Sequence, residues 1–65
     1  MRFGTFKTVK GVTVIITNYY PKVNEYLGYL MEKGKKVESL WDKEGKNLEE
    51  PDWDLVLTKE EHNRQ

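Results

Sequence analysis

The fold is decided by residues 12–33, VTVIITNYYPKVNEYLGYLMEK, where a β-branched run is followed by a proline and then by helix-like spacing. Residues 12–17 favour a strand, because Val, Ile and Thr pack well on a pleated surface. Residues 3–9 are rich in Phe, Thr and Val, and Lys10-Gly11 is typical of a turn, so we predict a β-hairpin. The predicted core face of its second strand carries Val12, Val14 and Ile16.

The spacing of residues 21–33 predicts an amphipathic helix. Pro21 suits the first turn, where its missing N–H would have no partner, and Lys33 followed by Gly34 is a typical helix end. At 100° per residue one apolar stripe is expected to pack on the sheet, and it consists of Val23, Tyr26, Leu27, Leu30 and Met31. Gly28 lies off this stripe, so it marks either a close backbone approach or nothing at all.

The residues that follow predict a second set of strands. Residues 37–41 alternate as a strand does, and residues 42–45 have the composition of a tight turn. A short strand over residues 46–49 would then return and end before Pro51, which cannot donate to a ladder. Residues 52–58 fit both a strand and a helical face, and we choose the strand.

The predicted order is ββαββ(β), an α+β fold. It implies a small two-layer sandwich in which one helix packs on one face of a mostly antiparallel sheet. The single domain is expected to span residues 1–58, and residues 59–65, which have no apolar side chain, are expected to form a flexible tail. The sheet face away from the helix would expose Ile15 and Leu40, which favours a partner or a second copy.

Catalytic and metal-binding motifs are absent from the sequence. The chain has no cysteine and one histidine, His62, and nothing around Ser39 forms a nucleophile elbow. The acids of residues 42–47 lack the spacing of a calcium loop, and the five glycines stand singly, so no phosphate-binding loop is present. We therefore expect no enzyme, no cofactor, no metal and no small-molecule substrate. Without a signal peptide or an apolar span, a cytoplasmic location away from membranes is expected.

Charge is balanced overall but divided along the chain. Residues 1–36 hold seven basic and two acidic residues, a net +5, whereas residues 37–65 hold four basic and nine acidic residues, a net −5. The two halves either form opposite surfaces that steer a partner or neutralise each other on folding.

These features favour a non-catalytic module that binds another protein or a second copy, such as a regulator or inhibitor carried by a phage or mobile element. Tyr29, on the polar side of the predicted helix, is the first candidate contact, because tyrosine is common in protein interfaces. Tyr19, Tyr20 and Lys22 at the helix entrance would extend this patch. An acidic cluster is either a solvated face or a contact for a basic partner, and it comprises Glu49, Glu50, Asp52 and Asp54.

Single-stranded nucleic acid is the alternative partner. Phe3, Phe6 and the two adjacent tyrosines stand among basic residues near the N-terminus, and aromatic side chains on a sheet can stack bases. A pI of about 6.6 argues against it, since dedicated nucleic-acid binders are strongly basic.

Overall fold

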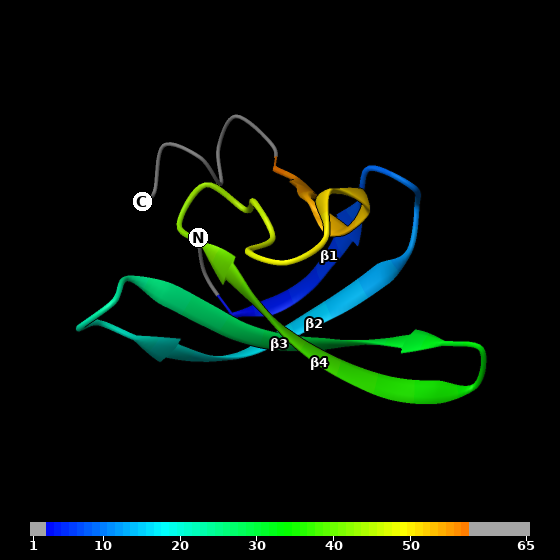
Figure 1. Ribbon diagram of the computed structural model, residues 1–65, viewed down its shortest axis with the longest axis horizontal. Helices are drawn as coiled ribbons and strands as arrows, with labels where there is room; N and C mark the ends of the chain where they lie inside the picture. Colours follow the sequence, from blue (N-terminus) through cyan, green and yellow to red (C-terminus); the bar gives the residue numbers. More distant parts are fainter. Residues whose placement is uncertain (1–2, 58–65) are drawn as a thin grey trace.

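The computed structural model describes residues 3–57 and is built almost entirely from antiparallel strands (Figure 1). The elements are β1 (Gly4–Thr8), β2 (Thr13–Tyr20), β3 (Glu25–Glu32), β4 (Lys35–Asp42), the 3-10 turn η1 (Pro51–Trp53) and β5 (Leu55–Val56). The strand order in the sheet is β4-β3-β2-β1-β5. The first four strands therefore form a meander, and the chain then returns so that β5 pairs with β1.

The predicted helix and the α+β class are wrong, because most of residues 21–33 forms β3, a strand inside the sheet between β2 and β4. Tyr26 of β3 pairs with Tyr19 of β2 on one side and with Trp41 of β4 on the other. Pro21 lies in the turn before β3, where Asn24 takes a left-handed conformation with φ 56°. No helix packs on either face of the described sheet, so the two-layer sandwich is replaced by a curved sheet that folds around its own core.

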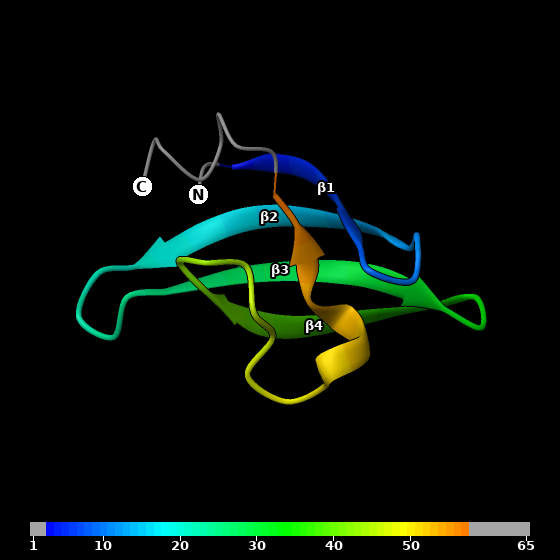
Figure 2. The same ribbon diagram turned by 90° about the horizontal axis from the view of Figure 1, so that it is seen from above.

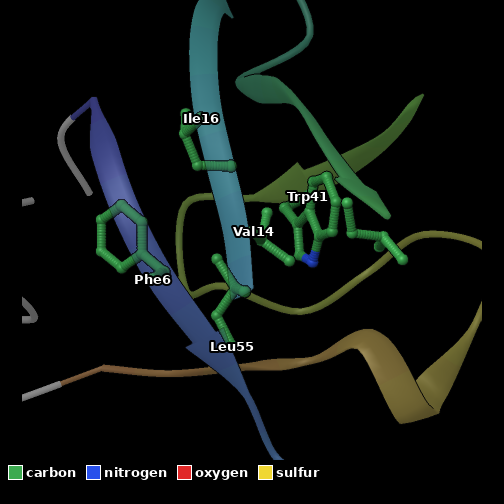
Figure 3. Close-up of a cluster of buried hydrophobic side chains, with 6 residues drawn as sticks. Phe6, Val14, Ile16, Trp41 and Leu55 are labelled. Atoms are coloured by element: carbon green, nitrogen blue, oxygen red, sulfur yellow. The ribbon is translucent and has the colours of Figure 1, made fainter. Parts of the chain in front are cut away.

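The core lies between the inner face of the sheet and the segment of residues 43–57, which crosses that face (Figures 1 and 2). Its buried side chains are Phe6, Val14, Ile16, Leu30, Trp41 and Leu55, and all of them except Leu30 are labelled in Figure 3. The predictions that Val14, Ile16 and Leu30 belong to the core are confirmed. Leu27, which was expected beside them, is only half-buried and lies on the outer face, paired with Leu40.

The remaining predicted elements have mixed outcomes. The first hairpin is confirmed, since Phe6 of β1 pairs with Val14 of β2, and residues 37–41 do form part of β4. The expected return strand over residues 46–49 is reduced to a single bridge between Trp41 and Asn47. Of the expected strand over residues 52–58, the described residues 52–57 begin in η1 and contribute a two-residue strand, and residue 58 lies outside the described residues. The expected tail of residues 59–65 lies outside the described residues.

A search of the described residues for a helix with the length and apolar character of a membrane span finds none.

Candidate functional site

Two hollows open where β2 and β3 separate. The ladder between these strands ends at the pair Val14–Leu30, and both hollows lie at this end of it. They share three lining residues, Val12, Leu30 and Met31, and together we call them the β2–β3 groove. The first, the acidic hollow, has a volume of about 280 Å³ and is also lined by Lys10, Glu32, Glu50, Asp52 and Trp53. The second, the tyrosine hollow, has a volume of about 180 Å³ and is also lined by Thr13, Ile15 and Tyr29.

The acidic hollow combines an apolar floor with a negative rim. Leu30 belongs to the core and Val12 packs against it, whereas Met31 is 57% exposed. Three carboxylates and one ammonium group, that of Lys10, stand around this floor. The hollow is therefore suited to a ligand that is apolar along its length and positive at its end.

The turn that carries part of the rim is anchored to the core. The indole N–H of Trp41 donates a hydrogen bond of 2.7 Å to the carbonyl oxygen of Trp53. Pro51 occupies the first position of η1, and the turn is closed by the bond from the Trp53 N–H to the Glu50 carbonyl oxygen at 3.0 Å. Because Trp41 is fully buried, this contact fixes the place of Glu50 and Asp52 relative to the sheet.

The four predicted acidic site residues divide into two pairs with different roles. Glu49 accepts a hydrogen bond of 3.0 Å from the Ser39 hydroxyl, and Asp54 accepts one of 2.8 Å from the Asn47 backbone N–H. Glu50 and Asp52 line the acidic hollow. Among the described residues, the carboxylates that accept hydrogen bonds are those of Asp42, Glu49 and Asp54. The carboxylates on the rim are thus available to a ligand.

This division predicts that Asp54 contributes to stability and that Asp52, two residues away, does not. Asp54→Ala should lower the free energy of unfolding by about 1–2 kcal/mol, because it leaves the Asn47 N–H without its acceptor. Asp52→Ala should change it by less than about 0.5 kcal/mol, as is usual for an exposed side chain without such a bond. Urea denaturation followed by tryptophan fluorescence would measure both. Equal losses in the two variants would contradict the division.

Tyr29 lies on the outer face of β3 and lines the tyrosine hollow, next to the acidic hollow. The ammonium group of Lys36 stands 4.6 Å from the centre of its ring. The element that carries Tyr29 was predicted wrongly. The structure places Tyr29 at the tyrosine hollow and Glu50 and Asp52 at the acidic hollow, and the two hollows share only the lining residues Val12, Leu30 and Met31.

The other aromatic candidates lie at the opposite end of the β2–β3 hairpin. Tyr19 packs on Tyr26 with ring centres 4.6 Å apart, and its hydroxyl donates a bond of 2.8 Å to Asn24. Burial, with a smaller contribution from Tyr19, raises the pKa of Tyr26. Tyr20 is exposed near the end of β2, and Lys22 is exposed in the turn. The contacts of Tyr19 hold the hairpin end together, and none of Tyr19, Tyr20 and Lys22 lines either hollow.

Several residues of the groove were not predicted from the sequence. From the sequence, Val12 and Met31 were expected in the core, Trp53 in a strand and Lys10 in a turn. The sequence could not show that these residues meet, because their meeting depends on where the β2–β3 ladder ends. Phe6, proposed above as a base-stacking residue, is 6% exposed and belongs to the core.

Comparison with protein-family models, curated proteins and solved structures was made with the whole chain. None of them matches. Within residues 3–57, no group of three His, Cys, Asp or Glu side chains is arranged to hold a metal ion.

Proposed function

We propose that this protein is a non-catalytic binding module that takes a cationic side chain of a partner protein into the acidic hollow. The observation that carries this proposal is the combination of three carboxylates with an apolar floor in one hollow. Lysine and arginine have the matching shape, because their aliphatic stems pack on apolar surface while their charged ends remain near water.

Arginine fits the hollow better than lysine. A planar guanidinium group can donate paired hydrogen bonds to carboxylates and can stack on an aromatic ring, whereas an ammonium group acts as a point charge. The acidic hollow offers both kinds of partner, since Glu50, Asp52 and Trp53 are all among its lining residues. A cation over a tryptophan face gains further stabilisation.

The volume of the hollow also favours a side chain over a free small molecule. Pockets for drug-sized ligands are roughly 300–1,000 Å³, and the acidic hollow, at about 280 Å³, falls below this range. The tyrosine hollow beside it would accept an apolar side chain of the same partner segment, packed against Ile15 and Tyr29. The partner sequence we expect is thus a basic residue next to an apolar one.

The same charges oppose the alternative of single-stranded nucleic acid at this site. Phosphate groups would meet the carboxylates of Glu32, Glu50 and Asp52, and like charges in close contact lower affinity.

A titration of the groove variants with blocked arginine (Nα-acetyl-arginine amide) tests the proposal. We expect saturable shifts of the backbone NMR signals of Val12, Leu30 and Met31, with a dissociation constant on the order of 1 mM for so small a ligand. The double variant Glu50→Gln/Asp52→Asn should weaken binding by about tenfold, because two charge-assisted partners are removed.

A second double variant provides the control. Glu25→Gln/Glu44→Gln removes the same charge far from the groove, at the other end of β3 and in the turn after β4. It should bind arginine as the wild type does. Equal weakening by the two double variants would show a non-specific charge effect and overturn the proposal, as would shifts that map to the Tyr19–Tyr26 end of the hairpin.

A further inference from the structure

The outer edge of β4 exposes backbone groups that can pair with another strand. β4 is the last strand on its side of the sheet (Figure 2). Across this edge Leu40 accepts a bond from the Leu48 N–H at 3.0 Å, and the Asp42 N–H donates to Lys46 at 2.9 Å. Backbone groups of alternate residues in an antiparallel strand point to the same edge. Lys36 and Glu38 therefore also direct their N–H and C=O groups outward.

In the described part of the chain, the backbone groups at the start of this edge have no backbone hydrogen-bond partner outside the sheet. The backbone bonds outside the strand ladders reach Leu40 and Asp42, and within residues 3–57 none reaches residues 35–38. A single lysine on an edge usually discourages pairing with another strand. Here Lys36 and Glu38 carry opposite charges and flank Val37 on the same strand.

We propose that two copies of this chain pair through these edges, antiparallel and centred on Val37, to form one continuous sheet of ten strands. In this register Lys36 lies opposite Glu38 of the second copy, and the two residues exchange both backbone hydrogen bonds. The two-fold symmetry repeats the same contact on the other side of Val37. Each backbone pair is thus matched by a pair of opposite charges.

Other registers either place like charges opposite each other or join the inner face of one sheet to the outer face of the other. Centring the pair on Lys36 places Lys36 opposite itself, and centring it on Glu38 places two carboxylates together, so both arrangements oppose like charges. A slip of one residue reverses the inner and outer faces of one sheet relative to the other. Among the registers centred on residues 36–38, whose outward backbone groups are free of other backbone bonds in the described chain, only the one centred on Val37 satisfies both conditions.

The dimer leaves the proposed binding function intact. Lys36 lies over the ring of Tyr29 in the tyrosine hollow, but none of residues 35–38 lines the acidic hollow that binds arginine in the proposed function. Dimerisation and arginine binding can therefore fail separately in experiments.

Disulfide trapping tests the register directly, because the chain contains no cysteine of its own. Val37→Cys places two thiols at the two-fold axis, in a non-hydrogen-bonded pair with Cα atoms about 4.5 Å apart, which suits a disulfide. Lys35→Cys is the control, because residue 35 would face residue 39 of the second copy. We expect mild oxidation to link the Val37→Cys protein at least about tenfold faster than the control. Equal rates for the two variants would overturn the proposal.

Charge reversal supplies an independent test by sedimentation velocity. Lys36→Glu and Glu38→Lys should each weaken the dimer by about tenfold, because each places like charges opposite each other twice. Mixing the two variants restores Lys–Glu pairs at both positions, so a heterodimer as stable as the wild-type dimer is expected. A wild-type protein that stays monomeric up to about 1 mM, or a mixture that forms no heterodimer, would overturn the proposal.

Discussion

Replacing Trp41 by alanine should lower the free energy of unfolding by about 3–5 kcal/mol, the cost of removing a large buried aromatic side chain. Trp41 is 0% exposed and packs between the sheet and the returning segment. The change also removes the indole donor that holds the Trp53 carbonyl oxygen. Small domains are only marginally stable, so we expect a largely unfolded population at 25 °C.

A second variant separates the lost packing from the lost hydrogen bond. Trp41→Phe keeps much of the buried ring but has no N–H, so a smaller loss of about 1–3 kcal/mol is expected. Urea denaturation followed by far-UV circular dichroism would measure both variants. Trp53 remains as their only tryptophan, so its fluorescence provides a second measurement of unfolding. A loss below about 1 kcal/mol for Trp41→Ala would contradict its place in the core.

The second large effect is expected at Gly28, where even a methyl group has no room. A Cβ atom at this position would lie 2.7 Å from Cδ1 of Ile16, 2.8 Å from the carbonyl oxygen of Ile15 and 3.2 Å from the Trp41 ring. The backbone oxygen cannot move away without disturbing the β2–β3 ladder. Gly28→Ala should therefore destabilise the protein by about 1–3 kcal/mol, as overpacking of a core does.

The sign of this effect distinguishes the strand from the predicted helix. In an exposed helix position the same substitution would stabilise the protein by about 1 kcal/mol. Thermal or urea unfolding of the single variant decides between the two. Ile16→Val removes the nearest contact, Cδ1, so the double variant Gly28→Ala/Ile16→Val should lose less stability than the sum of the two single losses. Strict additivity would contradict the steric explanation.

The strands β1, β2 and β4 could be predicted from the sequence because two signals point to strands there: the β-branched or alternating residues within each segment and the turn residues that flank it. The failure at β3 has a physical cause. Tyr26 and Leu30 face inward and Leu27, Tyr29 and Met31 face outward, so large apolar side chains occupy both faces of the strand. Such a pattern satisfies a period of 3.6 as well as a period of 2. Gly28 was the residue that could have decided, since a glycine between paired strands marks close packing.

The candidate site could be predicted only in part. Tyr29, Glu50 and Asp52 were selected for their chemistry, and that chemistry remains the basis of the proposed function. Local periodicity could not bring Met31 and Trp53 beside them, because their approach depends on the early end of the β2–β3 ladder and on the path of residues 43–57. Glu49 and Asp54 were chosen by the same reasoning, and only their hydrogen bonds reveal a structural role.

The most direct test of the proposed function compares two ligands that differ in charge but not in shape. Blocked citrulline has the length and planarity of blocked arginine but is neutral, so only arginine gains from the carboxylates around the acidic hollow. NMR titration of the wild-type protein should show saturable shifts at Val12, Leu30 and Met31 with arginine and binding about tenfold weaker with citrulline. Equal binding of the two ligands at these residues, or no binding of arginine, would contradict the account.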